Sequence, residues 1–197
     1  MGRQVLSIAA TMMTAVLLAL TVGQALPRGE QLLFSSSINW QAGTWSVYML
    51  DINRGVSQRL LTSRTDTMPG FPVVWSPDGK QIAFIATETE LQTYLVDPQG
   101  KNSRRLTGTP TDNEYNAAWS PDGLYLAFIG EGDGVRDVYL ADAEGNNPRN
   151  LTAGVGGFRS LVWSPDSRYL AVESQALANR ELYTFDIETG LLINVTA

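Results

Sequence analysis

The sequence repeats itself about every 44 residues, and this period limits the possible folds more than any other feature. The tetrapeptide Trp-Ser-Pro-Asp begins at Trp75, Trp119 and Trp163, so both intervals are 44 residues. A Tyr-x-x-Asp marker occurs once in each of four units, beginning at Tyr48, Tyr94, Tyr139 and Tyr183. An aliphatic residue followed by Thr closes each unit, beginning at Leu61, Leu106, Leu151 and Val195. Because several markers keep one order, the chain is a tandem array of four repeats.

Each repeat has the pattern of four short β-strands. In the second repeat we expect strands over Phe71–Trp75, Gln81–Ile85, Gln92–Val96 and Arg104–Thr107, which are rich in β-branched and aromatic residues. Between the first two strands, Ser76-Pro77-Asp78-Gly79 has the composition of a tight turn. No segment after Pro27 has a helical period. Four strands in about 44 residues is typical of one propeller blade, so we predict an all-β fold with about 15 strands.

The repeat resembles a known type. Trp75-Ser-Pro-Asp-Gly-Lys-Gln-Ile-Ala-Phe and its copies are similar to the TolB-type repeat of WD-like β-propellers, which also occurs in the propeller domains of prolyl-oligopeptidase-type peptidases. The resemblance extends from Gln31 to Ala197. It implies a binding platform, a gate or a scaffold, and the fold alone does not choose among them.

The N-terminal segment predicts export. Arg3 is the only charged residue before Arg28, and Val5–Val22 is almost entirely apolar or small. One hypothesis is a signal peptide over residues 1–25 that is cleaved after Ala25. The other is an uncleaved anchor, because the apolar run is just long enough to span a bilayer. Both place the protein in the periplasm or outside the cell, with membrane contact only through this segment.

The predicted repeats fill residues 26–197, with blades at about 26–65, 66–110, 111–154 and 155–197. The first blade is unusual, because its inner strand would fall on Leu20–Ala25, within the export segment. Three arrangements remain open: a four-blade ring that lacks one strand, an open arc, and a shortened relative of a longer propeller. An incomplete or open ring exposes strand edges and blade faces, so we expect self-association or pairing with another protein.

The composition excludes several kinds of chemistry. The chain has neither Cys nor His, which excludes disulfides, thiol nucleophiles, Cys/His zinc sites and Ser-His-Asp catalysis. Its 14 basic residues are scattered among 20 acidic ones, for a net charge of −6, which argues against nucleic-acid binding. Glu131-Gly-Asp133-Gly is too short for a calcium loop. We therefore expect no cofactor and no metal, and we predict a non-enzymatic interaction module.

Three alternatives stay open beside that prediction. The repeat is shared with peptidases, so the chain could be a propeller accessory to a hydrolase. A propeller can also bind a small ligand or a glycan. The third alternative is a hydrolase that works with carboxylates alone, since acidic pairs can act without His.

Two sets of residues are singled out by the repeat. The structural set contains the Trp, Pro and Asp residues of the motif, which we expect to pack between blades and to hold the turns: Trp75, Pro77, Asp78, Trp119, Pro121, Asp122, Trp163, Pro165 and Asp166. The candidate binding set contains positions that vary between repeats: Asn113, Glu114, Tyr115 and Arg159. The resemblance implies that these residues, together with the loops 87–90, 131–135 and 174–180, line the channel or the rim of the propeller.

Overall fold

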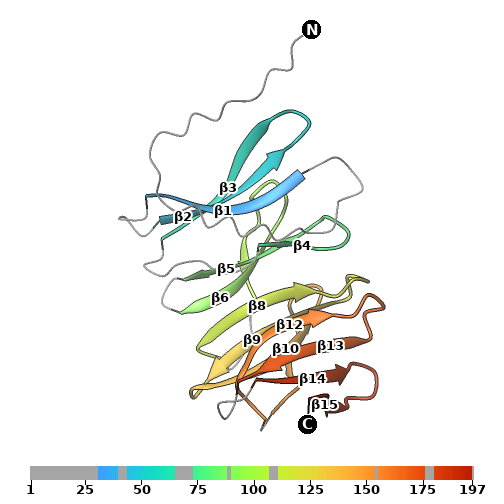
Figure 1. Ribbon diagram of the computed structural model, residues 1–197. Coiled ribbons are helices and arrows are strands. Elements are labelled where there is room, and N and C mark those ends of the chain that lie inside the picture. Colours follow the sequence, from blue (N-terminus) through green and yellow to red (C-terminus); the bar gives the residue numbers. More distant parts are fainter. Residues whose placement is uncertain are drawn as a thin grey trace.

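A computed structural model describes residues 31–39, 44–64, 73–87, 90–106, 111–153, 155–175 and 180–196. These residues form four antiparallel β-sheets that follow one another in chain order (Figure 1). The prediction of an all-β fold with about 15 strands is confirmed, since the described part contains 15 strands and no helix. It accordingly holds no helix that could cross a bilayer. The predicted export segment lies outside the described residues.

Each sheet is formed by one of the four sequence repeats and is one blade. Blade 1 has three strands in the described part, and they are β1 (Gln31–Asn39), β2 (Thr44–Asp51) and β3 (Val56–Arg64). Blade 2 consists of β4 (Val74–Trp75), β5 (Ile82–Thr87), β6 (Leu91–Val96) and β7 (Arg104–Arg105). Blade 3 consists of β8 (Asn113–Trp119), β9 (Tyr125–Gly132), β10 (Val135–Asp142) and β11 (Arg149–Asn150). Blade 4 consists of β12 (Phe158–Trp163), β13 (Tyr169–Ser174), β14 (Glu181–Asp186) and β15 (Leu192–Asn194).

The turn after the motif Trp holds itself through its Asp. In blade 2, the Asp78 carboxylate accepts the Ser76 hydroxyl at 2.7 Å and the Lys80 backbone N–H at 3.0 Å. Gly79 closes the turn with φ of 69°, in the left-handed region that Gly adopts without a steric penalty. The same Asp contacts recur in the other two copies of the turn. They show why Pro and Asp are repeated there: Pro sets φ at the second position and Asp satisfies the backbone.

Blade 4 has a serine where the other turns have glycine. Ser167 adopts φ of 61°, a conformation that costs energy for a residue with a Cβ atom. Its buried hydroxyl accepts the backbone N–H of Asp122 in the blade 3 turn at 2.9 Å. The hydrogen bond links the two blades and offsets the backbone strain.

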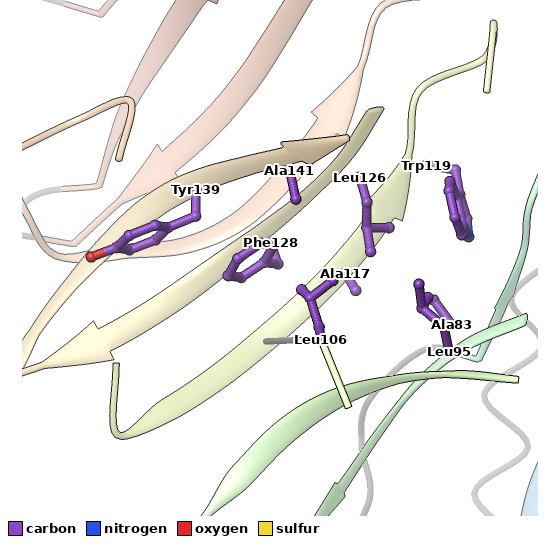
Figure 2. Packing of buried hydrophobic residues seen from close by; sticks show 9 residues of the cluster. All are labelled: Ala83, Leu95, Leu106, Ala117, Trp119, Leu126, Phe128, Tyr139 and Ala141. Carbon is purple, nitrogen blue, oxygen red and sulfur yellow. The ribbon is translucent and has the colours of Figure 1, made fainter. Parts of the chain in front are cut away.

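The hydrophobic core lies between the blades. Figure 2 shows the cluster between blades 2 and 3, in which Ala83, Leu95 and Leu106 of blade 2 face side chains of blade 3. The blade 3 side of that cluster consists of Ala117, Trp119, Leu126, Phe128, Tyr139 and Ala141. Similar clusters join blade 1 to blade 2 and blade 3 to blade 4. Each blade therefore buries its apolar faces against its neighbours, as repeat proteins do.

The outer face of blade 4 is uncovered in the described part of the chain. One cross-strand row on this face contains Val162, Ala171, Thr184 and Ile193. The matching row of blade 3 includes Ala127 and Leu140, which are buried against blade 4. In blade 4, Val162 is 61% exposed and Ile193 is 49% exposed. Blades 1 and 4 lie at opposite ends of the array in Figure 1, so the described residues form an open arrangement.

Candidate binding site between blades 3 and 4

An open cavity of about 420 Å³, closer in shape to a surface groove than to an enclosed pocket, lies between blades 3 and 4. Its lining comes from three strands of blade 3 and the first strand of blade 4: Tyr115, Asn116, Ile129, Arg136, Phe158 and Arg159. The volume falls within the range usual for small-ligand pockets. We call it the inter-blade cavity.

A β-bulge in β8 places one polar residue at the cavity. The pairing of β8 with β9 shifts register between Tyr115 and Ala118, and Asn116 lies within the shift with φ of 49°. Asn tolerates this left-handed conformation better than most residues. The Asn116 side-chain amide donates to the backbone carbonyl of Arg159. This bond crosses from blade 3 to blade 4 and fixes the backbone from which the Arg159 side chain extends.

Three side chains of blade 3 form a bonded cluster beside the cavity. Glu131 and Arg136 lie opposite each other across the β9–β10 hairpin, and Arg136 Nε is 2.7 Å from Glu131 Oε2. The Tyr115 hydroxyl donates to the same oxygen at 3.0 Å. The Arg136 guanidinium also lies over the Tyr115 ring, 4.4 Å from its centroid. A carboxylate with two donors and a cation over an aromatic face hold one another in place.

The cluster fixes its own protonation states. The hydrogen bond from Arg136 lowers the pKa of Glu131 below its ordinary value. Burial raises the pKa of Tyr115, and the hydrogen bond to Glu131 adds to the effect. Glu131 is therefore ionised and Tyr115 protonated at neutral pH, which keeps all three contacts in place.

Arg159 supplies a charge that the cluster does not balance. The Glu131 carboxylate neutralises Arg136, whereas the exposed Arg159 guanidinium has no ion pair among the described residues. The apolar part of the lining comes from Ile129 and Phe158, whose side chains belong to the core between the two blades. The inter-blade cavity thus combines apolar walls, an amide and one uncompensated positive charge.

The structure separates the four predicted binding residues into two pairs. Tyr115 and Arg159 both line the inter-blade cavity. Asn113 and Glu114 instead contact blade 2, where the Asn113 side-chain oxygen accepts the Leu91 backbone N–H at 3.0 Å. Glu114 is fully buried and accepts the Thr93 backbone N–H at 2.7 Å. The second pair therefore connects two blades and is not on the cavity surface.

Four lining residues were absent from the sequence prediction: the polar Asn116 and Arg136, and the apolar Ile129 and Phe158. A signal for Arg136 was present, because Asp133-Gly134 is a hairpin turn dipeptide and its register sets Arg136 opposite Glu131. Of the predicted loops, 131–135 contributes Glu131 to the cluster, while 88–89 and 176–179 lie outside the described residues.

The motif Trp residues pack at the ends of the first strands and do not line the inter-blade cavity. The Trp163 indole N–H donates to the Ala118 carbonyl of blade 3 at 3.1 Å, and its ring stacks on Tyr125. Trp119 belongs to the core between blades 2 and 3, and Trp75 packs against the core between blades 1 and 2. Among the described residues no group of three or more acidic side chains converges as a metal site would require.

No family model matches the chain, and no curated protein does. Solved structures match with TM-scores well above chance similarity. The TolB structure from Acinetobacter baumannii is 20% identical with a TM-score of 0.65, over 84% of this chain and 41% of that one. A putative TolB from Agrobacterium tumefaciens is 23% identical with a TM-score of 0.70, over 87% of this chain and 60% of that one. This chain therefore spans less than two thirds of either TolB structure.

The same fold occurs in enzymes. An oligogalacturonate lyase in complex with manganese is 19% identical with a TM-score of 0.65, over 84% of this chain and 50% of that one. A puromycin hydrolase is 15% identical with a TM-score of 0.68, over 86% of this chain and 27% of that one. The chain thus has the TolB-type propeller architecture that peptidase propeller domains share, and the predicted resemblance is confirmed at the level of the fold.

Proposed function

We propose that this chain is a non-enzymatic binding module of the TolB-like propeller type, which holds a ligand or a partner's side chain in the inter-blade cavity. One observation carries the proposal: Tyr115 of blade 3 and Arg159 of blade 4 line the same cavity. The hydrogen bond from the Asn116 amide to the Arg159 carbonyl fixes the polar side of that cavity. Binding sites commonly sit where a rigid frame presents a few polar groups over an apolar floor.

The chemistry of the cavity supports binding more than catalysis. Tyr115, Glu131 and Arg136 are bonded to one another, which keeps the Tyr115 hydroxyl protonated, and the described cavity lining contains no Ser, Thr, Asp or Glu side chain. The chain also lacks His and Cys altogether. A second candidate is a propeller accessory to a hydrolase, favoured by the match to the puromycin hydrolase structure, of which this chain covers 27%.

The site of action in this proposal is outside the cytoplasmic membrane. Its support is the apolar Val5–Val22 run behind Arg3, and the fold shared with TolB structures is compatible with it. N-terminal sequencing of the exported protein is the test. A mature protein that begins at Leu26 supports a cleaved signal, and an intact N-terminus in the membrane fraction supports an anchor. An intact chain in the cytosolic fraction contradicts export.

The proposal includes two protein contacts. Another protein binds at the inter-blade cavity, and a second copy of this chain covers the outer face of blade 4. The argument for a second copy is continuity of the interface, because Val162 and Leu182 are exposed at positions that match Ala118 and Val138, which pack between blades 3 and 4. Sedimentation velocity of wild type and of the Val162→Ser, Leu182→Ser double variant tests it. A wild-type dimer that the variant converts to monomer is expected, and a wild-type monomer at all concentrations contradicts it.

Affinity capture tests the binding function itself. The purified chain, Arg159→Glu and Arg149→Glu are each immobilised and exposed to envelope extract. Arg149 is also an exposed arginine, lies on β11 and does not line the cavity, so it serves as the matched control. We expect one retained species with wild type and Arg149→Glu that Arg159→Glu loses. Equal retention by all three proteins, or robust turnover in peptidase and glycosidase assays of the purified chain, contradicts the proposal.

A further inference from the structure

The charge balance of the inter-blade cavity indicates the kind of ligand that it accepts. Two arginines, Arg136 and Arg159, line the cavity and the Glu131 carboxylate lies beside it, and Arg136 and Glu131 neutralise each other at 2.7 Å. Arg159 therefore gives the cavity a net single positive charge. Because the whole chain carries −6, this is a local reversal of sign on an acidic protein.

The Arg159 guanidinium stands on a fixed backbone. Its carbonyl accepts the Asn116 amide from the neighbouring blade, and the residue before it, Phe158, is fully buried in the core between the blades. A guanidinium presents several N–H donors in one plane, and that geometry matches the two oxygens of a carboxylate. An arginine with an anchored backbone loses less entropy on binding than one on a free loop.

The apolar part of the lining favours an organic anion over an inorganic one. Ile129 and Phe158 are fully buried behind the lining, so the apolar surface that remains open to water belongs to the other lining residues, among them the half-buried Tyr115, whose ring lies under the Arg136 guanidinium. Methylene groups next to an anionic group would cover this surface and gain free energy by leaving water.

We propose that the inter-blade cavity binds a carboxylate on a short aliphatic stem, of the kind that a glutamyl side chain or a peptide C-terminus provides, with the Arg159 guanidinium as its partner. The proposal rests on the proposed binding function and names the ligand class of the same site. The Asn116 amide and the Arg136 guanidinium form the polar wall beside the bound carboxylate, and the half-buried Tyr115 ring contacts the stem.

Other charge types fit the cavity less well. A cationic ligand would compete with Arg136 and Tyr115 for Glu131, whose Oε2 atom already accepts two hydrogen bonds. A phosphate would bring close to two negative charges toward Glu131 and meet only one unbalanced guanidinium. A single carboxylate matches the single uncompensated charge.

The test is an NMR titration of the isotopically labelled full chain. Four probes are compared: the α-methylamide of N-acetylglutamate, which keeps only the side-chain carboxylate; N-acetylalanine, which has only the terminal one; the methylamide of N-acetylglutamine, which is neutral; and N-acetylphosphoserine methylamide. The backbone amide signals of Tyr115, Asn116 and Arg159 report on the cavity. We expect saturable shifts of these signals with at least one carboxylate probe, and the stronger of the two identifies the source. The neutral probe should leave them unchanged.

Matched variants complete the test. Arg159→Gln should weaken binding of the carboxylate probe about tenfold, the loss expected for one charge-assisted contact. Arg149→Gln, at the exposed arginine of β11, should bind as the wild type does, and the spectra of both variants verify the fold. Equal binding after Arg159→Gln, tighter binding of phosphoserine, or shifts located outside the cavity would overturn the proposal.

The outcomes also separate this inference from the proposed function. Binding of the neutral glutamine probe at the cavity, as tight as that of the glutamate probe, would leave the binding function in place and make the carboxylate assignment wrong. Absence of any shift with all four probes would make the carboxylate assignment wrong as well. The binding function fails only when the affinity capture also finds no species that depends on Arg159.

Discussion

Positions 114 and 158 are equivalent in blades 3 and 4, yet they connect their blades to the preceding ones by different chemistry. Glu114 pairs with Gly130 and Phe158 pairs with Ser174, in the same register of the same two strands. Both side chains are fully buried. Glu114 binds the Thr93 backbone N–H of blade 2, whereas Phe158 packs in the apolar core against blade 3.

The difference follows from one backbone N–H group, which is satisfied differently in blade 2 and in blade 3. In blade 3, the Val138 N–H, which corresponds to that of Thr93, donates to the Thr152 hydroxyl of the same blade at 2.9 Å. Thr152 is held in turn by Asp137 and Asn150. Blade 4 need not supply an acceptor, so an apolar residue can occupy position 158. The next residue, Arg159, lines the inter-blade cavity, and its carbonyl accepts the Asn116 amide of blade 3.

The largest expected effect on stability comes from removing the Phe158 side chain from the apolar core between blades 3 and 4. Phe158→Ala removes a fully buried aromatic side chain, which contacts Tyr183 edge to face, and should lower the free energy of unfolding by about 3–5 kcal/mol. Urea denaturation followed by tryptophan fluorescence measures the loss. A loss below about 1 kcal/mol would show that Phe158 does not hold the two blades together.

Loss of the Glu114 hydrogen bond between blades 2 and 3 should lower the free energy of unfolding by a smaller amount. Glu114→Leu keeps an apolar group of similar size but leaves the buried Thr93 N–H without its carboxylate acceptor, at a cost of about 1–3 kcal/mol. Glu114→Gln retains an acceptor oxygen and serves as the control, with a smaller loss. If the Leu variant is as stable as wild type, the Glu114 contact does not connect the blades.

The motif Trp residues offer a matched pair for the same comparison. The Trp163 indole donates to the Ala118 carbonyl, whereas the buried Trp119 indole has no acceptor among the described residues. Replacement of either Trp by Phe removes a similar volume, so Trp163→Phe should cost about 0.5–1.5 kcal/mol more than Trp119→Phe. Equal losses in urea denaturation would show that the hydrogen bond is not stabilising.

The smallest effect concerns pH at the cavity. The hydrogen bond from Arg136 lowers the pKa of Glu131 from an ordinary value of 4.5, so Glu131 contributes stability above that value and loses it as pH falls through the folded pKa. The stability difference between wild type and Glu131→Gln should therefore be constant near neutral pH and shrink in acid. Urea denaturation midpoints of both proteins, measured from neutral to acid pH, test this prediction. A stability difference that grows in acid would contradict the lowered pKa of Glu131.

The fold could be predicted from the sequence because its signals are local. Trp-Ser-Pro-Asp specifies a turn within a few residues, and the hydrogen bonds of Asp78 confirm the physical reason for its repetition. The ends of the last two repeats also make local contacts, since the Asn150 and Asn194 side chains accept the N–H groups of Thr152 and Thr196, two residues later in each case. Contacts of this kind depend on sequence spacing alone, which a repeat makes visible.

The candidate site could be predicted only in part because its contacts are not local. Glu114 and Tyr115 are neighbours in β8, but their side chains leave the strand on opposite faces. One therefore binds blade 2 and the other reaches the cavity toward blade 4. Variation between repeats indicated both positions as candidates. It did not show which face of the strand each side chain occupies. Asn116 was missed because a bulge, which shifts the register, brings its side chain to blade 4.

Site-specific photo-crosslinking tests most directly the claim that the cavity between blades 3 and 4 is where the molecule binds. A photoreactive residue is placed at Arg159 in one protein and at Arg149 in another, the exposed position on β11 that does not line the cavity. Both proteins are irradiated in envelope extract. We expect a discrete crosslinked product from position 159 and none from position 149. The same product from both positions, or a product from position 149 alone, would contradict the claim.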